Sequence, residues 1–199
     1  MAWPITVDYP DGKTRCGWPG NDELYIHYHD IEWGVPVRGD EAMFERIALE
    51  GFQAGLSWIT ILKRREGFRR AFENFEVARV AEMPEARVEE LMTDAGIIRN
   101  RAKIVATMSN ARLVRELQQS GQSISDLVWS FAPAEALRDE TDFAWLATTA
   151  ESDAMSKALR KLGFKFVGST TMYALMQATG LVNDHAPGCF RRAELVVQR

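Results

Sequence analysis

Apolar residues recur at helical spacing along most of this chain beyond residue 40, and this periodicity restricts the possible folds more than any other feature. The longest pattern begins at Asn100 and stops before Gly121, with apolar positions at Ile104, Met108, Ala111, Val114 and Leu117. Shorter helices are predicted from Asp40, from Ser57, over 66–74, 77–82 and 86–93, from Ser123 or Ser125 to 131, and over 153–162 and 170–179. No six-residue stretch alternates as a strand would. The sequence therefore predicts an all-α fold of eight or more short helices.

The length of 199 residues suits one compact domain or two small lobes that share a core, and we place a single helical domain at residues 15–190. Residues 1–14 are predicted to be a flexible extension, 191–199 a C-terminal tail, and 132–151 a long connection between helices. No apolar run approaches the ~20 residues that cross a bilayer, and the first residues lack the pattern of a secretory leader. The chain is therefore expected to be soluble, cytoplasmic and monomeric.

The net charge of −4, from 24 basic and 28 acidic residues, counts mildly against a nucleic-acid binder. Phosphate contacts are local, however, so the distribution of charge matters more than its sum. Basic residues gather at Lys63–Arg70, Arg99–Lys103 and Lys157–Lys165. These clusters either converge on one face or cover three separate solvated helices, and charge alone leaves both open.

Two half-motifs near the two ends of the chain have the residue types of a zinc site. Cys16 and His29 lie near the N-terminus, and His185 and Cys189 near the C-terminus. Two thiolates and two imidazoles complete a tetrahedral Zn²⁺ sphere, which leaves no open position and is typical of a structural site. The alternative is two reduced, buried cysteines and two ordinary histidines. His27 is expected to be a surface side chain.

The segment LMTDAGIIRNRAKI at 91–104 predicts a short helix, a tight turn at Gly96 and a basic helix start. It resembles the helix-hairpin-helix element, in which backbone N–H groups of the turn hold a DNA phosphate. That element usually has a second glycine where this chain has Ile98. An ordinary pair of antiparallel helices is the alternative.

The N-terminal third is rich in aromatic residues and contains one acid, Glu50, in an apolar context. The rings are Trp18, Tyr25, Tyr28, Trp33, Phe44, Phe52 and Trp58. They form either a hydrophobic core or a pocket whose faces stack on a flat base while Glu50 recognises its edge.

Taken together, these residues resemble the DNA-3-methyladenine glycosylase I family of the helix-hairpin-helix superfamily, from about Arg15 to Cys189. The matching segments are RCGW at 15–18, YIHYHDIEWGVP at 25–36, LEGFQAGLSWITILKRRE at 49–66, DAGIIRNRAKI at 94–104, VWSF at 128–131, SKALRKLGFKFVG at 156–168 and MQATGLVNDHAPGC at 176–189. The resemblance implies a helical glycosylase domain whose termini are clasped by one structural zinc on Cys16, His29, His185 and Cys189. It implies that Glu50 contacts the excised base. Tyr28 and Trp58 would stack on the base or meet its edge, and Trp18 and Tyr25 would line the pocket.

Phe52 departs from the family pattern, which often has glutamine there, although Gln53 follows it. Other glycosylases of the superfamily use an aspartate beyond the hairpin; this family lacks it. Asp184 is the nearest acid, and its neighbouring zinc ligand indicates a structural role instead. Leu56, between two predicted helices, is either a wedge that fills the gap left by the extruded base or a core residue.

The function implied is DNA repair by hydrolysis of the N-glycosidic bond of 3-methyladenine in alkylated duplex DNA, without strand cleavage. The expected DNA contacts are Leu56, Gly96, Arg99, Arg101, Lys103, Lys161 and Lys165. Two other classes stay open at this point: a non-catalytic module that binds damaged DNA, and a hydrolase of small nucleosides. Release of free base separates the first from an enzyme, and a steep salt dependence of binding argues against the second.

Overall fold

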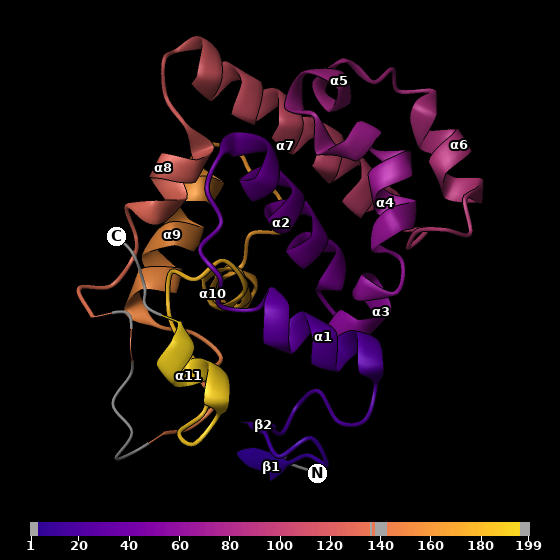
Figure 1. Ribbon diagram of the computed structural model, residues 1–199. Helices are drawn as coiled ribbons and strands as arrows, with labels where there is room; N and C mark the ends of the chain where they lie inside the picture. The colour runs from indigo at the N-terminus through magenta and orange to yellow at the C-terminus, as the bar shows by residue number, and fades with distance from the viewer. Residues whose placement is uncertain (1–3, 136, 138–142, 196–199) are drawn as a thin grey trace. The chain divides into compact units, whose positions relative to one another are not determined.

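The computed structural model describes residues 4–135, 137 and 143–195, and its regular structure is mostly helical (Figure 1). Backbone contacts group the chain into two compact units. The first unit comprises Met1–Val37, Ala132–Ala147 and Met176–Arg199, and the second comprises Arg38–Phe131 and Thr148–Leu175. The predominance of helix is as predicted from the periodicity.

The first unit contains a β-hairpin that the sequence did not reveal. Strands β1 (Thr6–Asp8) and β2 (Thr14–Cys16) pair antiparallel, with Thr6 opposite Cys16. The turn between them is closed by backbone hydrogen bonds between Tyr9 and Lys13 and between Gly12 and Tyr9. Strands of three residues are too short to show an alternating pattern, which is why an all-α fold was expected. The hairpin matters because β2 ends at Cys16.

Two whole helices lie in the first unit. Helix α1 (Glu23–Ile31) is capped by Asp22, whose side chain accepts a hydrogen bond from the Tyr25 amide. Helix α11 (Phe190–Glu194) begins directly after Cys189. Helix α1 therefore carries His29 in its last turn, and Cys189 directly precedes α11.

The second unit is built from short helices around a long one. In chain order they are α2 (Asp40–Gln53), α3 (Trp58–Leu62), α4 (Arg65–Ala71), the 3₁₀ turn η1 (Glu73–Phe75), α5 (Val77–Glu82), α6 (Arg87–Thr93), α7 (Arg101–Gln119), α8 (Ile124–Trp129) and α9 (Ala150–Lys161). Helix α10 (Ser169–Ala178) starts in this unit, and its last residues, from Met176, belong to the first unit. Helix α7 packs against α2, α5, α6 and α8.

A cluster of phenylalanines forms the core between α2, α4 and η1. The Phe52 ring centroid lies 4.5 Å from that of Phe68 and 5.9 Å from that of Phe72, and all three side chains are buried. Burying such a side chain contributes about 1.5–3 kcal/mol to folding. Phe52, which departs from the family pattern, is therefore a core residue that presents no polar group.

Capping residues set where several helices begin. Asn100 accepts a hydrogen bond from the Lys103 amide, and Ser123 from the Asp126 amide. Helix α9 starts earlier than we predicted, because Thr149 is its cap and Ser152 returns the reciprocal bond of a capping box. The sequence does not distinguish a serine at the N-cap from a serine inside the first turn, because a short hydroxyl side chain suits both positions.

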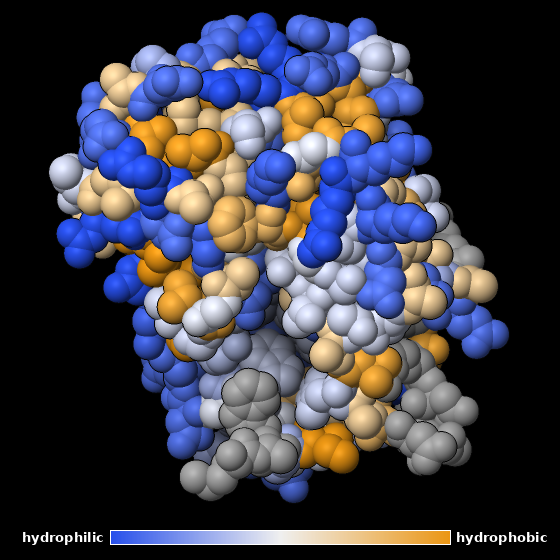
Figure 2. Space-filling view, turned by 180° about the vertical axis from the view of Figure 1, so that it is seen from behind, coloured by the Kyte–Doolittle hydropathy of each residue, from blue (hydrophilic) through white to orange (hydrophobic). Residues whose placement is uncertain are grey.

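The surface carries hydrophobic residues in separate small groups among hydrophilic ones, as Figure 2 shows for the face seen from behind. Within the described residues, no helix is long and apolar enough to span a membrane. The exposed large hydrophobic side chains include Leu24, Leu56, Val105 and Phe166. Isolated exposed apolar residues are normal, so only those at a built site carry meaning.

Candidate functional site

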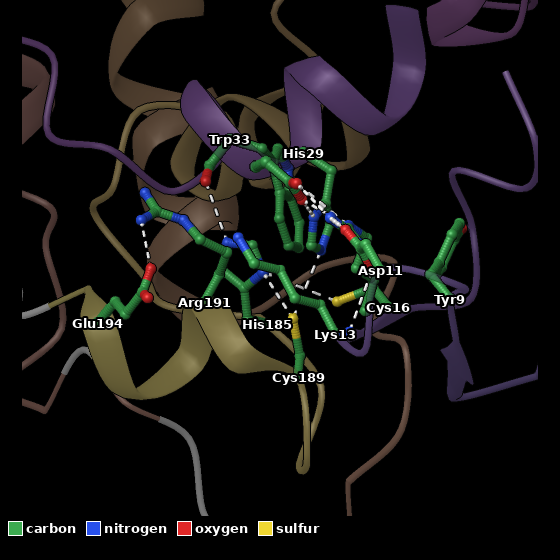
Figure 3. Close-up of polar contacts among 12 residues, drawn as sticks. Tyr9, Asp11, Lys13, Cys16, His29, Trp33, His185, Cys189, Arg191 and Glu194 are labelled. Carbon is green, nitrogen blue, oxygen red and sulfur yellow. Dashed lines mark hydrogen bonds and ion pairs between the residues drawn. The ribbon is translucent and has the colours of Figure 1, made fainter. Parts of the chain in front are cut away.

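Four side chains in the first unit converge on one point, and they are the four that the sequence singled out as metal ligands. Cys16 ends β2, His29 lies in the last turn of α1, and Cys189 precedes α11. His185 lies in the loop between α10 and α11. All four are buried, and their ligand atoms lie within 4.8 Å of one another. Figure 3 shows both sulfurs and the ring nitrogens pointing toward a common centre.

The distances within this cluster match the edges of a tetrahedron around one ion. The Cys189 Sγ lies 3.5 Å from His29 Nε2 and 3.5 Å from His185 Nδ1. The Cys16 Sγ lies 3.8 Å from His185 Nδ1. Metal–sulfur and metal–nitrogen bonds of roughly 2.3 and 2.0–2.1 Å at the tetrahedral angle place sulfur and nitrogen about 3.6 Å apart. The donor set therefore has the spacing that a small divalent cation requires.

Both histidines are oriented by a hydrogen bond on the ring nitrogen that faces away from the cluster. The His29 Nδ1 lies 2.8 Å from Oδ1 of Asp30. The His185 Nε2 lies 3.1 Å from the carbonyl oxygen of Trp33 (Figure 3). When those nitrogens donate, the lone pairs of His29 Nε2 and His185 Nδ1 point at the centre. Such second contacts fix the tautomer and the ring orientation of metal-binding histidines.

A buried arginine holds Asp30 in place. The Arg15 guanidinium bonds to both carboxylate oxygens of Asp30, with its Nη2 2.8 Å from Oδ2. Its other edge makes a bidentate pair with Asp11, at 2.9 and 2.7 Å. Burial raises the pKa of the Asp30 carboxyl, but hydrogen bonds from Arg15 and His29 lower it overall. Asp30 is therefore a carboxylate that faces His29.

The charge balance of the cluster also suits a cation. Burial, and then the nearby Cys189, raise the pKa of the Cys16 thiol far above its usual range. Hydrogen bonds from Cys16 and from both histidines hold the pKa of Cys189 well below its usual value. Burial lowers the pKa of His185, so its imidazole is neutral. Cys189 is thus a buried thiolate beside a second buried sulfur, and a divalent ion would supply the compensating positive charge.

Three of the predicted base-binding residues form one aromatic cluster in the first unit. The Trp18 ring centroid lies 4.8 Å from that of Tyr25 and 6.5 Å from that of Tyr28. The same indole contacts the metal cluster, with its centroid 5.3 Å from that of His29. Tyr28 is buried, while Trp18 and Tyr25 are partly exposed. The aromatic faces are thus held next to the metal ligands.

Trp33 was singled out only as an aromatic ring, and its ring and carbonyl prove to contact the Cys/His cluster. Its ring centroid lies 4.6 Å from that of His185, and its carbonyl orients the same histidine. Its side chain is buried. A backbone carbonyl leaves no trace in the residue type, so the sequence carried no signal for this role.

Glu50 lies on α2 in the second unit, and it is almost fully buried, with 3% of its surface exposed. Its Oε2 has no hydrogen-bond partner among the residues that the structure describes. Burial raises the pKa of the carboxyl to about 8, although the nearby Arg46 lowers it in part. Trp58, on the neighbouring helix α3, is also buried. An unsatisfied buried carboxyl oxygen is costly in a folded protein and points to a ligand.

The connection from α2 to α3 presents Leu56 to solvent. Gly55 adopts φ +83°, a backbone conformation that other residues rarely tolerate. The Leu56 amide closes the turn onto the Gln53 carbonyl at 2.6 Å. The Leu56 side chain is 42% exposed, so of our two interpretations the core position is wrong.

The segment 94–100 forms the turn between α6 and α7. The Gly96 amide donates to Oδ1 of Asp94 at 2.7 Å, so that donor is already engaged. The Gly96 carbonyl approaches α4 so closely that a Cβ on Gly67 would lie 2.1 Å from it. This contact explains why position 67 of α4, which faces the turn, needs a glycine. Arg99 is exposed beside the turn.

The other basic residues predicted to bind phosphates differ in their surroundings. Arg101 is 51% exposed and makes a bidentate ion pair with Glu89, at 2.5 and 2.7 Å. Lys161 and Lys165 are exposed. Lys103 is only 7% exposed, and its ammonium donates to two backbone carbonyls. Our expectation of a surface role for Lys103 is therefore wrong, because the run RNRAK does not reveal which position faces inward.

Asp184 is a structural acid, as its sequence position indicated. It is buried, and its Oδ2 accepts a hydrogen bond from Gln177 Nε2 at 2.9 Å.

Comparison with known proteins gives one consistent result. The sequence model of the methyladenine glycosylase family matches residues 18–192. The chain is 53% identical, over 88% of its length and 95% of the relative's, to DNA-3-methyladenine glycosylase 1 of Escherichia coli K12. It superposes with TM-score 0.85 and 51% identity on a crystal structure of 3-methyladenine DNA glycosylase I, covering 88% of this chain and 98% of that one. A variant of 3-methyladenine DNA glycosylase I in complex with 3-methyladenine gives TM-score 0.83 at 32% identity, with 89% and 97% covered.

Proposed function

This chain belongs to the methyladenine glycosylase family, and from that premise we propose that it excises 3-methyladenine from alkylated duplex DNA in base excision repair. The reaction breaks the bond between C1′ of the deoxyribose and N9 of the base. Water adds its oxygen to C1′ and gives up a proton, so the products are free 3-methyladenine and an abasic site.

Methylation at N3 gives the attached base a positive charge, which makes it a good neutral leaving group. The electron pair of the breaking bond neutralises that charge, and the sugar passes through a state with oxocarbenium character. Little acid or base assistance is then needed. Positioning of the substrate and exclusion of bulk water provide most of the rate acceleration. This agrees with the hydrogen bond that occupies the Asp184 carboxylate.

The observation that carries the recognition proposal is the buried Glu50 carboxyl with its unsatisfied Oε2. A pKa of about 8 means that the empty protein keeps this group mostly protonated at neutral pH. A bound cationic base supplies the missing counter-charge and hydrogen-bond donors from its amino edge, which favour the carboxylate. Neutral adenine offers no such charge, so Glu50 selects the methylated base.

We assign the remaining base contacts as the family resemblance implies. Tyr28 and Trp58 stack on the base or meet its edge, and Trp18 and Tyr25 line the pocket. Aromatic faces attract a cationic ring by about 0.5–2 kcal/mol. The contribution adds to that of Glu50, so selectivity comes from charge as well as shape.

DNA binding is assigned to exposed groups of the second unit. Leu56 fills the space left by the extruded base, and the α6–α7 turn at Gly96 acts as a helix-hairpin-helix element. Arg99, Arg101, Lys161 and Lys165 contact phosphates. The reaction needs no Schiff base to a lysine, so we expect the enzyme to be monofunctional and not to cut the strand. It acts as a monomer.

The four-ligand cluster is assigned to one structural zinc ion. Two sulfurs and two nitrogens at tetrahedral spacing, with oriented imidazoles, are what zinc takes in closed sites. Cys16 and His29 would join His185 and Cys189, so that the ion ties the β-hairpin and α1 to α11. The ion takes no part in the reaction.

The test is chromatographic measurement of the bases that purified protein releases from alkylated duplex DNA. We expect 3-methyladenine in the supernatant, abasic sites in the DNA, and no strand breaks before alkali treatment. Glu50→Gln should release far less base while binding undamaged duplex as the wild type does. Binding without release would favour a non-catalytic module. Cleavage of free nucleosides with no loss of affinity at high salt would favour a nucleoside hydrolase.

A further inference from the structure

Lys103 is a buried lysine with an unusual set of partners. Its side chain leaves α7 and crosses to the end of α2, where Nζ donates to the carbonyl oxygens of Phe52 at 2.8 Å and Ala54 at 2.6 Å. No carboxylate contacts it among the described residues, and burial lowers its pKa. Backbone carbonyls at a helix C-terminus carry partial negative charge and lack partners within the helix, so the ammonium acts as a cap.

The capped backbone leads directly to Leu56. Helix α2 ends at Gln53, and Ala54 and Gly55 form the turn that exposes Leu56. Lys103 therefore holds the backbone of Phe52 and Ala54, which lies shortly before Leu56 in the chain. Without it, two carbonyls at the start of the turn would lose their donor, and the turn could relax toward solvent.

A second exposed hydrophobic residue lies beside the same ammonium. The Phe166 ring centroid is 5.8 Å from Lys103 Nζ, and the ring is 37% exposed. Phe166 has φ +57°, which is strained for an aromatic residue. Such a conformation persists only when its surroundings hold it.

The surroundings of Phe166 do hold it. Asn110 of α7 clamps the preceding residue, donating to the Lys165 carbonyl at 3.1 Å and accepting from the Lys165 amide at 3.0 Å. On the other side, Ser156 donates to the Val167 carbonyl at 2.7 Å. A Cβ on Gly51 would lie 3.3 Å from the Phe166 Cβ, so α2 passes close to this loop at a glycine.

We propose that Lys103 is a positioning residue that joins the Leu56 turn to the Phe166 loop, so that both hydrophobic side chains press on the duplex at the lesion and help to extrude the base. Phe166 thereby becomes a second DNA contact besides Leu56. The inference rests on the proposed glycosylase function. It assigns Lys103 to opening of the duplex and leaves recognition of the free base to Glu50.

The experiment compares Lys103→Met, Lys103→Arg and Phe166→Ala with the wild type under single turnover. The substrates are two oligonucleotides with one 3-methyladenine, either paired in a duplex or unpaired in a bulge. Lys103→Met should slow release from the paired lesion by about tenfold or more and from the bulge by less than about threefold, since the bulged base is already unstacked. Lys103→Arg should recover much of the rate, because a guanidinium can still donate to both carbonyls.

Phe166→Ala removes an exposed side chain and should fold normally. It therefore still tests the proposal if Lys103→Met does not fold. It should show the same preference for the bulged substrate. Both variants should bind free 3-methyladenine like the wild type. Arg79→Met, which removes a 62%-exposed charge on α5, is the control and should act like the wild type on both substrates.

Equal slowing on the paired and bulged substrates, or weaker binding of the free base, would overturn the proposal in favour of a general structural role. A flatter salt dependence of duplex binding in Lys103→Met would overturn it in favour of a phosphate contact. If the wild type itself releases no base from either substrate, the proposed function fails, and this inference fails with it.

Discussion

The His29 Nδ1 lies 2.8 Å from Oδ1 of Asp30, its neighbour in sequence, and that carboxylate is held in turn by the buried Arg15. The three residues form a chain from a buried guanidinium to an imidazole of the Cys/His cluster. The contact determines that His29 presents Nε2 to the two cysteines and His185. In the proposed metal site, a residue outside the four ligands would therefore influence metal affinity.

Replacing Asp30 by asparagine should weaken metal binding by about tenfold to a hundredfold, the usual cost of losing such a partner. The amide keeps the size of the side chain but removes the charge that pairs with Arg15 and supports His29. Competition with a chelator of known affinity measures the effect. Asp11→Asn is the matched control, because Asp11 contacts Arg15 but not His29. Equal weakening in both variants would mean that Arg15 alone matters.

Purified protein should contain one zinc per chain, and removing the ion should melt the first unit. Metal binding of this kind is coupled to folding, since the site does not exist in the unfolded chain. Cys189→Ser and His29→Ala should both lose zinc and lower Tm in elemental analysis and thermal denaturation. His27→Ala should retain full zinc content, because His27 is exposed on the same helix. A metal-free protein with unchanged Tm would contradict the assignment.

Glu50→Gln should bind free 3-methyladenine about tenfold to a hundredfold more weakly than the wild type. The charge-assisted hydrogen bond that it loses is worth about 1.5–3 kcal/mol. Titration followed by tryptophan fluorescence measures the affinity, and binding of undamaged duplex serves as the control. Wild-type affinity for the free base in this variant would remove Glu50 from the recognition site.

The stability of the wild-type protein should fall between pH 5 and pH 8.5 relative to Glu50→Gln. Burial raises the pKa of Glu50 to about 8, so above its ordinary value near 4.5 the folded state binds more protons than the unfolded state. Stability then decreases as pH rises through that window, because the buried carboxyl must ionise. Thermal denaturation of both proteins across this range measures the difference. Parallel curves would show that Glu50 is not buried as a neutral acid.

Arg101→Ala should weaken binding of damaged and intact duplexes alike and reduce the slope of log K against log salt by about 0.9, the value for one lost phosphate contact. Glu89→Gln is the informative counterpart, because Glu89 pairs with the Arg101 guanidinium and would compete with DNA for it. That variant should bind duplex at least as tightly as the wild type. Weakening confined to damaged DNA would show that Arg101 contacts the lesion and not the backbone.

The local features of this protein were readable from its sequence. Helical periodicity predicted the mostly helical fold, since an amphipathic pattern reflects the packing of each helix. The four members of the Cys/His cluster could be singled out by residue type, because few side chains bind a transition metal and the chain has only two cysteines. The sequence drew attention to Glu50 because burying an acid in an apolar segment costs free energy unless a partner compensates for it.

The tertiary structure decided which atoms each of these residues meets. In the sequence, Lys103 is one of three basic residues of the segment RNRAK. On α7, however, the Lys103 side chain is buried, whereas that of Arg101 faces solvent. The strained Phe166 and its Asn110 clamp join segments 55 residues apart in the chain, which no local pattern encodes. The orienting carbonyl of Trp33 is backbone, and so independent of the side chain. Residue type limits the chemistry that a position can perform. The direction in which a side chain points and the groups that it contacts are determined only when distant segments pack together.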